Sequence, residues 1–263
     1  MRILSKLAVA CWGTVAMLAF SGASFAEAGA VTVNLTNGKN IYENGKTGVN
    51  GQPDVPACAT CHGDKAMGND AMGSPRLANI GYTYIVKQLT NFADDKRTDN
   101  IMMQMNGIAK GLSEQERRDL AAYENSFPRN AELSDLKALK DDGKTIGIAY
   151  KGEEIVKYGL ERNGQVIASA CVTCHQYNGR GAAPIYPKIG EQKYTYLVSQ
   201  LTAWRSAERA NDPMGQMRAV AKNLTDDDIN NVATFLSQAP DSTSGDGMQV
   251  PNEPVLHNLH VVH

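Results

Sequence analysis

Cys58-Ala59-Thr60-Cys61-His62 returns later in the chain as Cys171-Val172-Thr173-Cys174-His175, so the sequence contains two Cys-x-x-Cys-His pentads. This spacing is the attachment signature of c-type haem. Two cysteines three residues apart lie on one face of a helical turn, where both can form thioethers with one porphyrin. The next residue, histidine, can then ligate the iron. We therefore predict two covalent haem c groups, attached at Cys58, Cys61, Cys171 and Cys174, with His62 and His175 as iron ligands.

The first 26 residues have the features of a secretory signal peptide. Arg2 and Lys6 form its positive end, Leu7 to Phe20 is an apolar run of 14 residues, and Ser24-Phe25-Ala26 is a small-x-small cleavage site. An uncleaved anchor is the alternative, although 14 residues are short for a bilayer span of about 20. Because bacteria attach haem c outside the cytoplasm, we expect a soluble periplasmic protein.

Without residues 1–26 the chain keeps 237 residues, which is enough for two domains of about 100 residues each. It then has 24 Lys and Arg against 28 Asp and Glu, a net charge of −4. A protein without a basic excess is a poor nucleic-acid binder. We therefore expect no nucleic-acid partner.

The second half of the chain repeats the first at an offset of 112 residues. Tyr82-Thr83-Tyr84-Ile85-Val86-Lys87-Gln88-Leu89-Thr90 becomes Tyr194-Thr195-Tyr196-Leu197-Val198-Ser199-Gln200-Leu201-Thr202. The pentads are offset by 113, so the first copy has one extra residue between its pentad and Pro75. A repeat of this length indicates two copies of one domain. We place the domains at 31–132 and 147–240, with a linker at 133–146 and a disordered tail at 241–263.

Each copy has a mostly helical pattern. A short first helix is expected near Ile41-Tyr42 and again near Ile155-Val156, and the segment from Tyr82 carries its apolar residues on one helical face. Capping boxes begin the last helix of each copy, Ser113 with Glu116 and Thr225 with Asp228.

The connecting segments have weaker patterns. One or two helical turns are expected within 134–144. We find no alternating pattern long enough for a strand, and segments 45–56 and 159–169 are interpreted as loops before each pentad.

The ligand on the other side of each iron decides between a closed electron carrier and an open, reactive haem. Met105 and Met217 align between the copies, as do Met102 and Met214, each just before the last helix. Packing residues are the alternative, since methionine fills apolar gaps. We predict Met105 and Met217 as ligands, with Met102 and Met214 as the second choice. Met67 and Met72 are interpreted as packing or exposed residues.

The ligating imidazole also needs an acceptor for its other ring nitrogen, which fixes the tautomer. Pro75 and Pro187 follow the two histidines by 13 and 12 residues, and their carbonyls can serve. A simple turn proline is the alternative.

The chain resembles the dihaem cytochrome c4 family over roughly residues 38–127 and 147–239. The resemblance rests on the two pentads, on the Tyr-x-x-x-Gln-Leu segments, and on a methionine that lies seven residues before a Leu-Ser or Leu-Thr pair. The resemblance implies an all-α fold of two tandem class I cytochrome c domains related by a pseudo-twofold axis. It implies His/Met ligation of both irons, with the family's methionine falling on Met105 and Met217. It also implies electron transport between a quinol-oxidising complex and terminal oxidases.

We therefore predict an electron-transfer protein rather than an enzyme, with redox proteins as partners and peripheral membrane association as an option. The first alternative is the dihaem subunit of a periplasmic dehydrogenase, such as flavocytochrome c sulfide dehydrogenase. The second is a haem peroxidase or sensor with one open iron. The domains are expected to dock with facing haem edges, with Arg97 and Arg209 near the propionates. His257, His260 and His263 are interpreted as a solvated terminus rather than a metal site.

Overall fold

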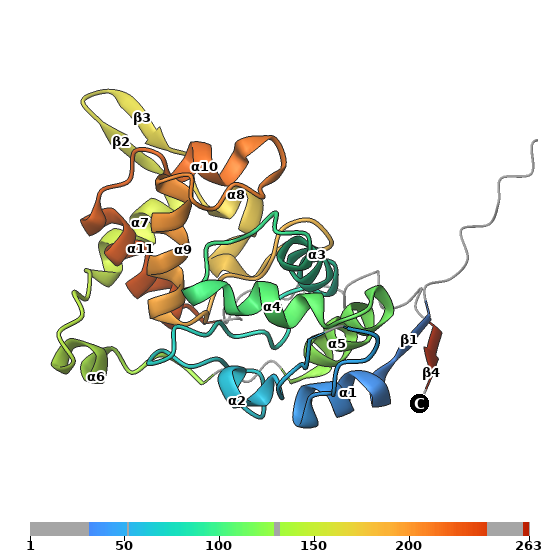
Figure 1. Ribbon diagram of the computed structural model, residues 1–263. Coiled ribbons are helices and arrows are strands. Elements are labelled where there is room, and N and C mark those ends of the chain that lie inside the picture. Colours follow the sequence, from blue (N-terminus) through green and yellow to red (C-terminus); the bar gives the residue numbers. More distant parts are fainter. Residues whose placement is uncertain (1–31, 52, 129–131, 241–259, 263) are drawn as a thin grey trace, which may run out of the picture.

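The computed structural model describes residues 32–51, 53–128, 132–240 and 260–262. The chain folds into two helical units that lie side by side, joined by a segment that carries one short helix (Figure 1). The expected signal peptide, residues 1–26, lies outside the described residues. Within the described residues, no helix is both long and apolar enough to cross a bilayer.

The α-helices follow the same order in the two units, and the second unit has one additional 3-10 helix, η2. The first contains α1 (Leu35–Asn44), α2 (Ala59–His62), α3 (Tyr82–Ala93), η1 (Ile101–Met103), α4 (Gln104–Lys110) and α5 (Glu114–Ser126). The linking helix is α6 (Leu136–Asp141), within the segment predicted to form one or two turns. The second contains α7 (Ala149–Tyr158), α8 (Val172–His175), η2 (Tyr177–Gly179), α9 (Tyr194–Arg205), η3 (Pro213–Gly215), α10 (Gln216–Ala221) and α11 (Asp226–Gln238).

In both units the first helix crosses the last at a glycine. A Cβ atom on Gly38 of α1 would overlap the Asp119 carbonyl oxygen of α5, and one on Gly152 of α7 would overlap the Asn231 carbonyl oxygen of α11. Only a residue without a side chain permits such a close approach of two backbones. Ile41 and Tyr42, like Ile155 and Val156, are buried at these crossings. The predicted first helices are therefore confirmed.

The last helices begin as predicted. The Ser113 hydroxyl accepts from the Glu116 N–H, and the Glu116 carboxylate accepts from the Ser113 N–H. Thr225 and Asp228 form the same reciprocal pair. Each capping carboxylate also binds a cation from the segment before its pentad, Lys46 in the first unit and Arg162 in the second.

The expectation of no useful strand was wrong in the second unit. Segment 159–169 is not a loop, because β2 (Leu160–Arg162) and β3 (Gln165–Ala168) form an antiparallel hairpin. Asn163 and Gly164 connect the strands, both with positive φ. Asn-Gly is the preferred two-residue hairpin turn, so this dipeptide was the signal in the sequence.

A second strand pair involves the segment interpreted as a disordered tail. β4 (His260–Val262) pairs in parallel with β1 (Thr32–Asn34) at the edge of the first unit. The rest of that segment, including His257 and His263, lies outside the described residues.

Candidate haem-binding sites

Both pentads form one helical turn with nearly identical backbone geometry. Cys58 has φ −62° and ψ −33°, and Cys171 has φ −63° and ψ −33°. The His62 N–H donates to the Cys58 carbonyl at 2.9 Å, and the His175 N–H donates to the Cys171 carbonyl at the same distance. The turn therefore holds both cysteines and the histidine together in each unit.

The proline carbonyls are the predicted imidazole acceptors in both units. Nδ1 of His62 lies 2.9 Å from the Pro75 oxygen, and Nδ1 of His175 lies 2.9 Å from the Pro187 oxygen. A carbonyl can only accept, so Nδ1 carries the proton and Nε2 has a free lone pair. Burial lowers the pKa of both histidines and favours the neutral ring. Each ring is therefore prepared to ligate a metal through Nε2.

The extra residue of the first copy lies in the turn after the pentad. A backbone bridge joins Asn69 to Ser74 in the first unit and Ala182 to Tyr186 in the second, so the first turn is one residue longer. The longer turn carries Asp70, whose carboxylate accepts from the Thr195 N–H of the other unit. The insertion therefore contributes to the contact between the units.

A cavity of about 310 Å³ opens beside the first pentad. Cys58, Cys61, His62 and Met105 all line it. Met102 does not, and its side chain is 88% exposed. Met67 is buried in the core, whereas Met72 is exposed and reaches the rim of the cavity.

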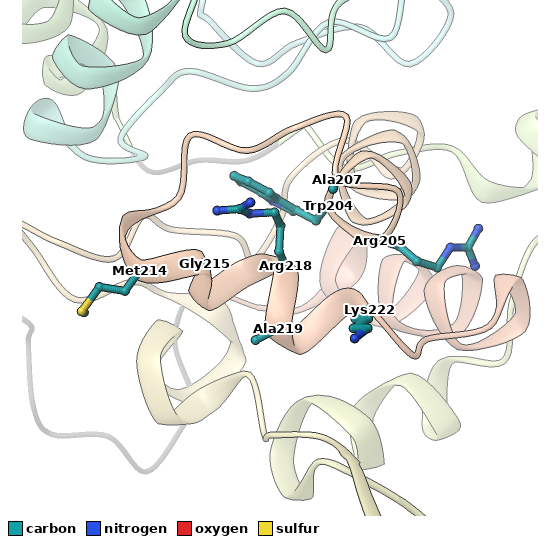
Figure 2. A pocket seen from close by; sticks show the side chains of 8 residues that line it. All are labelled: Trp204, Arg205, Ala207, Met214, Gly215, Arg218, Ala219 and Lys222. Carbon is teal, nitrogen blue, oxygen red and sulfur yellow. The ribbon is translucent and has the colours of Figure 1, made fainter.

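In the second unit, Met217 is half-buried against the cluster that contains Trp204 and Leu224. Met214 is 90% exposed at the edge of a surface hollow of about 520 Å³. Figure 2 shows Met214 pointing away from the other side chains that line this hollow. Neither the second pentad nor Met217 lines this hollow.

The second histidine has an aromatic neighbour. The Tyr186 ring lies edge-on to the His175 ring, with the two ring centroids 6.0 Å apart.

The chemistry around the pentads fits a covalently held porphyrin. Burial raises the pKa of the Cys58 thiol to about 12 and that of Cys171 to about 11, as expected for surroundings that suit an uncharged thioether sulfur. The walls of the first cavity are mainly apolar, with Leu77, Ile85 and Leu120 among them.

A pseudo-symmetric cluster of polar side chains joins the two units. Arg97 donates to Tyr196 at 3.0 Å and to Gln200 at 2.8 Å across the contact. Arg209 donates in turn to Tyr84 and to Gln88, each at 3.0 Å. Both guanidinium groups also lie over an aromatic ring of their own unit, Phe92 for Arg97 and Trp204 for Arg209.

The arginine pair carries more positive charge than its protein partners balance. Among the described residues, Asp99 is the only carboxylate in an ion pair with either arginine, and it pairs with Arg97 at 2.9 Å. Burial alone would raise the pKa of the Tyr84 hydroxyl, but the charges on Arg209 and Arg97 lower it. A buried cation needs a partner, so this surplus fits the acidic propionates of a haem.

A second, asymmetric set of contacts holds the units together. Arg76, which is only 1% exposed, forms an ion pair with Glu191 at 2.9 Å. The Gln192 side chain accepts from the Arg76 N–H and donates to the Arg76 carbonyl. Residues of the second unit also complete the wall of the first cavity: Thr195, Tyr196, Ser199 and Gln200.

Sequence reasoning missed several polar residues in the wall of the first cavity, and one of them is the buried carboxylic acid Glu124. Glu124 of α5 is 3% exposed and lines the cavity. Its counterpart at the offset of 112 is Leu236. The aligned repeats therefore held the signal, a charged residue in one copy opposite an apolar residue in the other.

The family model for cytochrome c matches residues 35–126 and 161–240. A thiosulfate dehydrogenase electron acceptor from Stutzerimonas stutzeri is 34% identical over 82% of this chain and 92% of its own length. A cytochrome c4 from Pseudomonas aeruginosa is 32% identical over 71% of this chain and 85% of its own.

Two solved structures of the same kinds of protein are similar to this chain. The reduced cytochrome c4 from Pseudomonas stutzeri aligns with a TM-score of 0.58 and 30% identity over 70% of this chain and 93% of that one. The thiosulfate dehydrogenase TsdBA from Marichromatium purpuratum aligns with a TM-score of 0.66 and 26% identity over 80% of this chain, which spans 41% of that chain.

The chain therefore belongs to the cytochrome c family, whose members carry covalently bound haem c. Within the family it is a member of the dihaem cytochrome c4 group, with two tandem cytochrome c domains, and it is an electron-transfer protein rather than an enzyme. The predicted family, fold class and electron-transfer role are confirmed.

Proposed function

We propose that the chain is a periplasmic dihaem cytochrome that carries electrons from a redox enzyme to the respiratory chain, with one haem c in each unit. The duplicated proximal site carries this proposal. In both units a buried, neutral histidine follows two cysteines on one helical turn and donates Nδ1–H to a proline carbonyl at 2.9 Å. Each haem, when bound, supplies one reversible electron.

Met105 and Met217 are the proposed second ligands. The position of Met105 supports this choice, because it lines the same cavity as Cys58, Cys61 and His62. Met217 is half-buried at the equivalent position, while Met102 and Met214 are exposed. A neutral thioether favours the reduced iron, so both potentials should be positive.

The ligand proposal is tested by substitution in the haem-loaded protein. Met105→Ala and Met217→Ala should each turn one haem high-spin, lower its potential and let carbon monoxide bind. Met102→Ala and Met214→Ala are the matched controls and should leave both haems low-spin. Carbon monoxide binding to the unsubstituted protein would contradict the proposal and favour a peroxidase or sensor with an open iron.

The haem count is tested by mass spectrometry of the mature protein. We expect a chain that begins near Glu27 and carries two haems that acid acetone does not extract. The N-terminal residue found would also test cleavage after about Ala26 and hence export to the periplasm. A mass with one haem would overturn the dihaem proposal.

We propose a thiosulfate-oxidising dehydrogenase as the electron donor. The support is the coverage of the relatives: the thiosulfate dehydrogenase electron acceptor matches 82% of this chain, against 71% for the cytochrome c4 from Pseudomonas aeruginosa. Stopped-flow reduction by such a dehydrogenase with thiosulfate should be fast and should slow with salt if charge guides the encounter. Reduction by a quinol-oxidising complex alone would contradict this donor.

Purification from the native source separates a shuttle from an enzyme subunit. A shuttle should be isolated free of its donor. Co-purification with a flavoprotein at fixed stoichiometry would instead favour the dihaem subunit of a dehydrogenase.

A further inference from the structure

Glu124 has one carboxylate oxygen without a hydrogen-bond partner. The residue lies on α5, is 3% exposed and lines the cavity beside the first pentad. Its Oε2 atom is fully buried and has no partner among the described residues. A buried carboxyl group without a partner is costly in its charged form and unusual in a native protein. Its presence in the cavity wall therefore requires an explanation, either structural or functional.

The titratable groups that surround Glu124 carry no charge to stabilise its carboxylate. Tyr42 of α1 faces it, with a hydroxyl that donates to the Gly63 carbonyl at 2.6 Å and a pKa raised by burial. Cys58 faces it from the segment before α2, and in the haem-loaded protein its sulfur is a neutral thioether.

Other titratable groups in the cavity wall are engaged elsewhere. Arg97 and Asp99, which follow α3, pair with each other, and the Tyr84 hydroxyl of α3 binds Arg209. The only cause of the shift at Glu124 is burial, which raises the pKa of its carboxyl group to about 8. The carboxyl group is therefore poised between its two forms near neutral pH.

The second unit has no such group at this place. Leu236 of α11 occupies the equivalent position and is 2% exposed in an apolar cluster with Val156 and Val232. The polar group is thus confined to the first cavity, although the two units share the order of their α-helices and the geometry of the cysteine turn and the histidine.

We propose that Glu124 is a proton-binding site coupled to the first haem, so that reduction of this haem is accompanied by proton uptake at Glu124 while reduction of the second is not. The proposal rests on the presence of haem in the first crevice. Oxidised haem iron carries one positive charge more than reduced iron, and this charge favours the nearby carboxylate. An electron from the donor would remove that charge, and the carboxylate would then take up one proton (H⁺) from the bulk solvent and become the neutral acid. In a buried site of low effective dielectric, the two charges interact strongly.

A redox titration of the two-haem protein between pH 5 and pH 9 tests the proposal. One of the two potentials should fall as the pH rises, with a slope that approaches about 59 mV per tenfold change in proton concentration. The other should stay level over the same range. In Glu124→Gln both should stay level. The matched control Glu114→Gln removes an exposed carboxyl group from the same helix and should keep the slope.

Infrared difference spectroscopy of the unsubstituted protein gives a second readout that needs no variant. Reduction near pH 7 should produce a protonated carboxyl band, and this band should be absent from Glu124→Gln. Two level potentials, or a slope and band that persist in Glu124→Gln, would overturn the proposal. Loss of haem from the first pentad would instead appear in the mass of the protein, so failure of the proposed function is distinguishable.

Discussion

The haem crevices of the two units share the residues that would attach and ligate the haem, but they differ in the side chains that line their walls. The cysteine turn, the histidine–proline bond and the capping box are repeated in both. In the walls, Glu124 faces the first crevice where the second unit has Leu236, and Tyr186 stands beside His175 where the first unit has Ser74. The repeated parts include the cysteine turn, on which covalent attachment depends, and the histidine–proline bond, which orients the imidazole. The walls differ in charge, and such a difference would give two bound haems different reduction potentials.

The largest effect is expected at the contact between the units. Arg97→Met should destabilise the haem-loaded protein by about 3 kcal/mol or more, because it leaves the buried Asp99 carboxylate without its ion-pair partner. Arg209→Met should cost less, since no carboxylate among the described residues forms an ion pair with Arg209. Arg205→Met, which breaks a pair with the exposed Asp226, is the control and should cost at most about 1 kcal/mol.

Urea unfolding measures these three costs. Small-angle scattering should show whether the units stay docked, with a radius of gyration of about 18 Å for a compact chain of this length. If Arg97→Met and Arg209→Met lowered the free energy of unfolding equally, the ion pair between Arg97 and Asp99 would not be the cause of the loss.

The helix crossings test what the two units share. Gly38→Ala and Gly152→Ala should each destabilise their unit by about 3 kcal/mol, because the new methyl group overlaps a backbone carbonyl. Gly107→Ala is the matched control, since nothing lies within 4 Å of a Cβ atom there. It should be neutral or stabilise α4 by up to about 1 kcal/mol. Thermal unfolding monitored at the haem absorbance separates these outcomes. An equal loss of stability in Gly107→Ala would contradict the explanation that overlap with a backbone carbonyl causes the cost at Gly38 and Gly152.

Glu124 tests what the two units do not share. Because burial raises its pKa in the folded state, the folded carboxyl group keeps its proton while the unfolded chain loses it. The stability of the first unit should therefore fall as the pH rises from about 4.5, the ordinary glutamate value, to about 8. Glu124→Leu should remove this fall, with a difference on the order of a few kcal/mol at the alkaline end. Denaturant midpoints at pH 4, 6 and 8 check it, and parallel curves for both proteins would refute it.

The smallest effects are expected at the two capping carboxylates. Lys46→Ala and Arg162→Ala should each cost at most about 1 kcal/mol, because both pairs are partly exposed. Burial alone would raise the pKa of Glu116, but the hydrogen bonds from Lys46 and Ser113 together lower it. The lowered pKa means that the charged carboxylate stabilises the folded protein. This stabilisation is fully present above the ordinary glutamate pKa and is lost as the pH falls through the lowered pKa of Glu116. Thermal midpoints at pH 7 and pH 3 should show the cost of Lys46→Ala at the higher pH only.

The repeat made much of this structure predictable from the sequence. An internal offset of 112 aligns helices, caps and prolines, and a pattern present twice is easy to interpret. The features that were missed occur once. The β2–β3 hairpin depends on Asn163-Gly164 in the second unit alone, and Glu124 reads as one more polar residue in a polar helix. Its burial depends on how α5 packs against α1 and α3, which local periodicity does not encode.

The contribution of α9 makes the first cavity depend on both halves of the chain. Thr195, Tyr196, Ser199 and Gln200 belong to the second unit, yet they wall the cavity beside Cys58 and Cys61. A fragment that ended before α9 would lack these four residues, and that side of its haem cavity would be open to solvent.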